Sequence, residues 1–254
     1  DYPSITGDQM LYWIINDDVP GAGNITMTDG MGLQVRSSLY GFDCSKSPCP
    51  DPDVDYVTFL THEISNKSGL AYTDVYSSAW IDTDIGNFAD DAVGCDSTRN
   101  LAFGYNGDST DTSYPGSAPP AFGTTILESP GNIGMGGMMY YENDFSVQGN
   151  PQGAEEYYNY MRSMWKDGSP LTFGGNGYGG TVPTKYIYSG DAGFCGGPQS
   201  GWSEVSANIT PFDRRYIQSI GPFNLAVGEE IRITQANLWA QDSAGSHLGS
   251  LCRL

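Results

Sequence analysis

The fold class is decided by Val57-Thr-Phe-Leu-Thr-His-Glu-Ile-Ser65, then Asn66-Lys-Ser-Gly69, then Leu70-Ala-Tyr-Thr-Asp-Val-Tyr-Ser-Ser-Ala-Trp-Ile81. Both long segments alternate apolar and polar residues and are rich in β-branched and aromatic side chains, which is the pattern of half-buried strands. The four polar residues between them end in glycine, as hairpin turns commonly do. We therefore predict that Val57–Ser65 and Leu70–Ile81 form a hairpin of long antiparallel strands.

Comparable segments recur along the chain, and we expect strands at Gln9–Ile15, Leu33–Tyr40, Leu101–Tyr105, Met138–Phe145, Lys185–Ser189 and Glu230–Trp239. One segment has helical spacing instead: Pro151 to Asp167 carries aromatic and methionine side chains three and four residues apart, and Gly168 offers a stop. Gly-rich and Pro-rich stretches separate these elements. The sequence thus predicts an all-β protein, an antiparallel and jelly-roll-like β-sandwich with one decorating helix and long Gly/Pro-rich loops.

The bulk composition limits the partners of the chain. Its 254 residues are enough for one large β-sandwich, and we expect residues 1–254 to form a single module that belongs to a longer polypeptide. With 30 acidic and 11 basic residues, the net charge is −19, which repels nucleic acid and anionic lipid surfaces. No apolar run is long enough for a membrane-spanning helix.

The five cysteines lie at positions 44, 49, 95, 195 and 252, without the spacing of a zinc or redox motif. Cys44 and Cys49 enclose a short, turn-prone loop that a disulfide can close in an oxidising compartment. The sequence leaves this pairing open and does not pair the other three.

The densest group of carboxylates follows the strand that ends near Ile81. We expect one Ca²⁺ ion to be bound by Asp82, Asp84, Asp90, Asp91 and Asp96, because Ca²⁺ takes six to eight oxygen ligands and Gly86 allows a tight turn around it. The loop is not an EF-hand, whose sixth and twelfth positions are Gly and Glu. The alternative is a solvated acidic turn. A second acidic loop, with Asn106, Asp108 and Asp111, either closes over the same ion or is a hairpin tip.

No motif predicts a catalytic centre. Gly175-Asn-Gly177-Tyr-Gly-Gly180 has the letters of a dinucleotide fingerprint but runs into Pro183 rather than a helix. The two histidines, His62 and His247, lie in no metalloprotease motif. Paired carboxylates for glycoside hydrolysis stay open, the candidates being Glu63, Glu128, Glu142 and Glu204. Aromatic residues that either stack on sugars or belong to the core are Tyr140, Tyr141, Tyr178, Tyr186 and Tyr188.

Several stretches together resemble a family of large secreted or surface proteins of Bacteroidota-type bacteria, commonly exported by the type IX secretion system. They are Trp80-Ile-Asp-Thr-Asp-Ile-Gly86, Asp90-Asp-Ala-Val-Gly-Cys-Asp96, Tyr105-Asn-Gly-Asp108, Pro119-Pro-Ala-Phe-Gly123, Glu156-Tyr-Tyr-Asn-Tyr-Met161 with Trp165-Lys-Asp-Gly168, and Asp213-Arg-Arg-Tyr216 with Ser219-Ile-Gly-Pro-Phe223. The resemblance implies an extracellular, β-rich module and no established enzymatic activity. Ala92 stands where the family often has an aromatic residue.

We therefore expect a secreted or cell-surface module that is not catalytic, is stabilised by calcium and serves in assembly or adhesion. Its expected partners are copies of itself or neighbouring surface proteins, in a filament or surface assembly that is sensitive to calcium. The alternatives are a carbohydrate-binding module, with glycans as partners, or a secreted hydrolase.

Overall fold

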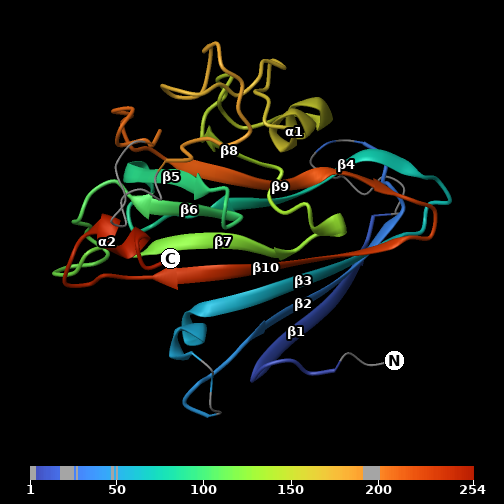
Figure 1. Ribbon diagram of the computed structural model, residues 1–254, viewed down its shortest axis with the longest axis horizontal. Helices are drawn as coiled ribbons and strands as arrows, with labels where there is room; N and C mark the ends of the chain where they lie inside the picture. Colours follow the sequence, from blue (N-terminus) through green and yellow to red (C-terminus); the bar gives the residue numbers. More distant parts are fainter. Residues whose placement is uncertain (1–3, 18–25, 27, 47–48, 50, 191–200) are drawn as a thin grey trace.

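The computed structural model describes residues 4–17, 26, 28–46, 49, 51–190 and 201–254. In this part of the chain two antiparallel sheets pack together (Figure 1). The larger sheet has, in spatial order, β1 (Gln9–Asn16), β2 (Leu33–Gly41), β3 (Val57–Asn66), β10 (Glu230–Ala240), β7 (Ala121–Glu128), β6 (Leu101–Asn106) and β5 (Asp91–Asp96). The smaller has β4 (Tyr72–Asp82), β9 (Arg214–Leu225) and β8 (Gly137–Glu142). The predicted all-β, antiparallel sandwich is confirmed.

The predicted hairpin is wrong, although both of its strands exist. β3 pairs with β2 on one side and β10 on the other, whereas β4 pairs with β9 in the opposite sheet. The chain therefore crosses between the sheets after Asn66. The buried Asn66 side chain holds this crossing, because its amide donates to the carbonyl oxygens of Leu70 (2.7 Å) and Ala226 (3.0 Å). Both edges of β3 are already occupied, so it has no free edge for β4.

The sequence prediction missed three strands, β5, β7 and β9. β5 lies inside the acidic stretch, and all six of its residues are buried, so its pattern does not alternate. Conversely, Lys185–Ser189 is not a strand, and its backbone pairing with β8 is limited to an isolated bridge between Tyr186 and Met138. The side-chain alternation in Lys185–Ser189 thus reflects packing against the core rather than sheet pairing.

The helices are shorter than the periodicity indicates. The predicted helix from Pro151 to Asp167 is α1 (Ala154–Met161), and the chain turns away at Ser163, whose φ is +59°. A positive φ is incompatible with continuing a right-handed helix. A second short helix, α2 (His247–Leu251), lies near the end of the chain, and 3₁₀ turns η1 (Pro52–Tyr56), η2 (Phe88–Asp90) and η3 (Pro130–Asn132) complete the elements. No helix in the described part of the chain combines the length and hydrophobicity that crossing a bilayer requires.

The main core lies between the small sheet and the half of the large sheet that is formed by β10, β7, β6 and β5. It extends under the long segment that follows β8. Trp165 is fully buried there, and its indole N–H donates to the carbonyl oxygen of Gly177 at 2.9 Å. Gly177 has φ +85°, and an added Cβ would lie 2.6 Å from Ile187 and 2.8 Å from Leu171. The glycine-rich stretch is therefore a loop that packs on the core, as its sequence context predicts. The Cys44–Cys49 disulfide is present, and Cys195 lies outside the described residues.

Candidate metal centre

The acidic loop joins the small sheet to the edge of the large one. β4 ends at Asp82, η2 covers Phe88–Asp90, and β5 begins at Asp91. The loop bends at Gly86, whose φ is +75° and whose added Cβ would lie 2.4 Å from the carboxylate of Asp111. Only glycine fits there, because the second acidic loop packs directly against it.

The structure divides the five predicted calcium ligands among three places. Asp82 and Asp84 meet Asp213, and one carboxylate oxygen from each lies within 4.8 Å of the others. Arg215 lies in the same cluster, 2.8 Å from Asp82 and 3.0 Å from Asp213, and supplies a positive charge. Burial and the neighbouring Asp82 raise the pKa of Asp84. This cluster already contains its own counterion.

Asp91 is in a different environment from the exposed Asp82 and Asp84. Its side chain is fully buried, and its Oδ2 accepts the N–H of Ile85 at 3.1 Å. Burial raises the pKa of Asp91 to about 8, with the charge of Asp90 acting in the same direction and the Ile85 N–H opposing it. Burial also raises the pKa of Asp90. The negative charge at this end of β5 is thus strongly disfavoured without a cation.

Asp96 does not belong with the other four residues. It lies at the far end of β5, about 17 Å from Asp91 at the usual rise per strand residue. Its Oδ1 accepts the backbone N–H and the hydroxyl of Thr98, and its Oδ2 pairs with Arg99 at 3.0 Å. Burial alone would raise the pKa of Asp96, but these contacts hold it below its usual value. Asp96 is a turn residue, so the five aspartates cannot bind one ion together.

Sequence reasoning missed Asp213 and Arg215 as neighbours of the acidic loop, since β9 lies more than a hundred residues downstream. The only available signal was the Asp213-Arg-Arg215 triplet. The second acidic loop lies against the first: Asp111 Oδ2 accepts the N–H of Asn87 at 2.8 Å.

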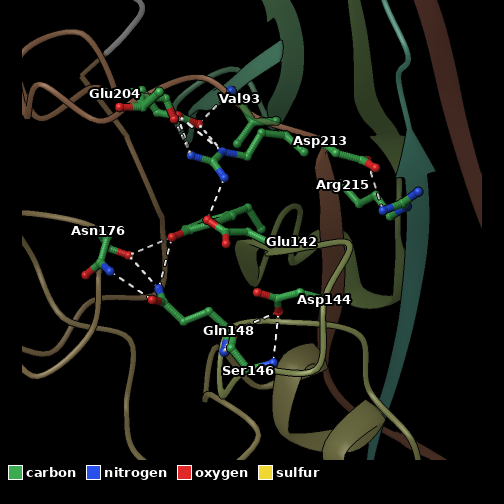
Figure 2. A network of polar contacts seen from close by, with 12 residues as sticks. Val93, Glu142, Asp144, Ser146, Gln148, Asn176, Glu204, Asp213 and Arg215 are labelled. Atoms are coloured by element: carbon green, nitrogen blue, oxygen red, sulfur yellow. Dashed lines mark hydrogen bonds and ion pairs between the residues drawn. The ribbon is translucent and has the colours of Figure 1, made fainter. Parts of the chain in front are cut away.

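The four glutamates considered for hydrolysis do not form one group. Glu63 pairs with Arg36, and Glu128 with Arg232. Glu142 and Glu204 instead share the buried guanidinium of Arg214, at 2.6 Å and 3.3 Å. Figure 2 shows this network with Glu204 beside Val93, whose N–H donates to Glu204 Oε1 at 3.0 Å.

Further polar contacts extend the Glu142–Glu204 network towards the glycine-rich loop (Figure 2). Gln148 donates to the hydroxyl of Tyr140 at 2.9 Å and accepts from the amide of Asn176 at 2.8 Å. Every group named here has a partner within the fold. The arrangement is that of a structural network that ties the long segment after β8 to the sandwich.

The tyrosines considered as a sugar platform are mostly core residues. Tyr140 and Tyr188 are buried and stack on each other at 5.7 Å, and Tyr178 is exposed but donates its hydroxyl to Asp167 at 2.8 Å. His62 is a sheet residue, as predicted, and its Nδ1 lies 2.8 Å from the hydroxyl of Ser37. Burial lowers the pKa of His62.

Compared with known proteins, the chain matches no family model and no curated protein at a significant level.

Proposed function

We propose that this chain is a non-catalytic assembly or adhesion module of a secreted or cell-surface bacterial protein, and that it joins a second copy of itself through the outer edge of β1. The exposure of β1 is the observation that carries the proposal. The Cys44–Cys49 disulfide supports an oxidising, extracellular location.

β1 is an apolar strand that the sandwich leaves uncovered. Seven of its eight residues are exposed. Leu11 and Ile15 point to one face of the sheet and Ile14 to the other, and they are 63%, 55% and 50% exposed. Figure 1 shows β1 at the end of the large sheet that is farthest from β8 and β9. Such a strand is a ready template for pairing with another chain.

The outer edges of β5 and β8 are covered by segments of the same chain. On β5, the carbonyl oxygen of Asp91 accepts the N–H of Phe212 at 3.0 Å. On β8, Met138 exchanges backbone hydrogen bonds with Lys185 and Ile187 at 2.8 and 3.0 Å. No comparable backbone bond reaches the outer edge of β1 from any residue whose position the structure describes. The fold therefore protects these edges and leaves β1 available.

The charge of β1 fits a homotypic contact. Its sequence, Gln9-Met-Leu-Tyr-Trp-Ile-Ile-Asn16, has no charged residue, whereas the whole chain has a net charge of −19. Two such chains repel each other overall, and the local repulsion is smallest where uncharged surfaces meet. Antiparallel pairing of β1 with β1 of a second copy would be a two-fold, self-complementary contact. Because a dimer would use up this edge, growth into a filament would need a further contact.

Introducing lysine on both faces of β1 should strongly weaken the association. For Leu11→Lys combined with Ile14→Lys, we expect at least tenfold weaker self-association, since lysine is the side chain that natural edge strands use against pairing. Sedimentation velocity over a range of protein concentrations, with and without calcium, measures this. The matched control is Phe145→Lys, at a 77% exposed site outside the sheet, which should associate as the native chain does. A native chain that stays monomeric throughout would overturn the self-pairing, and equal association of the variant would overturn the role of β1.

A further inference from the structure

Two polar side chains are buried side by side where β5 begins and β6 ends. Asp91 and Asn106 are register partners in this antiparallel pair, and both are 0% exposed. Their side chains therefore leave the same face of the sheet. Asp91 Oδ1 and both amide atoms of Asn106 have no hydrogen-bond partner among the described residues. Buried polar groups without partners are rare in folded proteins, and each requires an explanation.

Two neighbouring residues carry further buried oxygen atoms without described partners. The buried hydroxyl of Thr83, which also lacks a described partner, would lie 2.7 Å from a Cβ added at Gly104. Gly104 is two residues before Asn106 on β6 and thus shares its face of the sheet. Asp90 precedes Asp91, and its Oδ1 is likewise buried without a described partner. Four side chains from three segments thus carry buried oxygen atoms without described partners on or beside the β5–β6 strand pair.

The second acidic loop forms the outer wall of the same region. Asp90, Asp108 and Asp111 line a hollow of about 700 Å³ beside Gly86. None of the 11 lysines and arginines, all of which lie in the described ranges, forms an ion pair with Asp90, Asp91 or Asp111. This separates the region from the Asp82–Asp84–Asp213 cluster, where Arg215 supplies the positive charge.

We propose that a Ca²⁺ ion binds between these two loops, with Asp91 and Asn106 as its buried ligands and Asp90 and Asp111 closing over it from the rim. Carboxylate and amide oxygens are the ligands that Ca²⁺ prefers, and it accepts irregular sets of six to eight oxygens. The carboxylates of Asp90, Asp91 and Asp111 are not all within 4.8 Å of one another, so binding draws the rim inward. The site is independent of the β1 edge.

Calcium-dependent melting of the full chain tests the site. After removal of divalent ions with EDTA, Ca²⁺ at 100 times its Kd should raise the Tm of the native chain by roughly 5–10 °C. Mg²⁺ should raise it much less, because it requires a regular octahedral site. Asp91→Asn should abolish the response, and without calcium it should melt at or above the native Tm, because an amide replaces a buried carboxylate. If Asp91 had only a structural role, Asp91→Asn would not both remove the Ca²⁺ response and leave the calcium-free Tm equal or higher.

Direct binding keeps the proposal testable if Asp91→Asn fails to fold. Tb³⁺ bound at the site should luminesce on tyrosine excitation, and Asp111→Asn, at the rim, should weaken its binding at least tenfold. The matched control is Asp82→Asn, in the Arg215 cluster, which should keep both the Ca²⁺ response and the Tb³⁺ affinity. A native Tm indifferent to Ca²⁺ would overturn the proposal. So would a response that Asp82→Asn removes and Asp111→Asn keeps, since the ion would then lie in the Arg215 cluster.

Discussion

Replacing Arg214 by methionine is expected to destabilise the fold by about 3–5 kcal/mol at pH 8, because it leaves a buried carboxylate without its partner. The Arg214 side chain is 2% exposed and pairs with Glu204, which is 1% exposed, and with Glu142. It also donates to the carbonyl oxygen of Thr210 at 3.0 Å and lies over the ring of Tyr140, 5.0 Å from its centroid. No other cation is paired with Glu204 in the described structure.

The loss at Arg214 should depend on pH. Burial raises the pKa of Glu204 to about 7 from its ordinary 4.5, and Arg214 opposes this rise. Without Arg214 the folded-state pKa rises further above the unfolded value. A raised carboxyl pKa favours the folded state at low pH, and this advantage is lost as the pH increases through the folded-state pKa. Arg214→Met should therefore cost less at pH 5, where Glu204 is protonated, than at pH 8.

Chemical denaturation at pH 5 and pH 8 measures both parts of the Arg214 prediction. Arg99→Met is the matched control, because Arg99 also pairs with a carboxylate, that of Asp96, but is 74% exposed, and its loss should cost less than about 1 kcal/mol. Adding Glu204→Gln to Arg214→Met should recover part of the loss at pH 8, since it removes the unpaired charge. Equal losses for Arg214→Met and Arg99→Met would show that the buried network contributes little.

Trp165→Ala should destabilise the chain by about 3–5 kcal/mol, the usual cost of removing a large buried aromatic side chain. Trp165 is 0% exposed, contacts Tyr140 edge-on at 5.6 Å, and fixes the glycine-rich loop through its bond to Gly177. The control is Trp13→Ala on β1, where the side chain is 38% exposed. In dilute, monomeric protein it should cost less than about 1 kcal/mol. Thermal and chemical denaturation of both variants would reveal whether the segment after β8 is part of the cooperative core.

Local pattern was sufficient for the elements that alternate. β2, β3 and β10 were predicted within a residue or so of their observed ends, because they alternate at least in part, and β1 was predicted equally well because its aromatic and branched residues mark it as a strand. β5 and β9 were missed because they are mostly buried along their central parts and their residues do not alternate. The acidic loop was recognised as a candidate site from composition alone, since aspartates so close in sequence must repel one another.

The sequence by itself determined that the protein is all-β and acidic, and that its carboxylates concentrate after β4. The tertiary structure alone decided which strands pair and which carboxylates meet. In the folded chain β3 and β4 lie in different sheets, and Asp96 lies at the opposite end of β5 from Asp91. Asp82 pairs with Arg215, and Asn106 lies opposite Asp91. The physical reason is that strand patterns record burial and not partner identity, whereas pairing and charge neutralisation depend on residues distant in the chain.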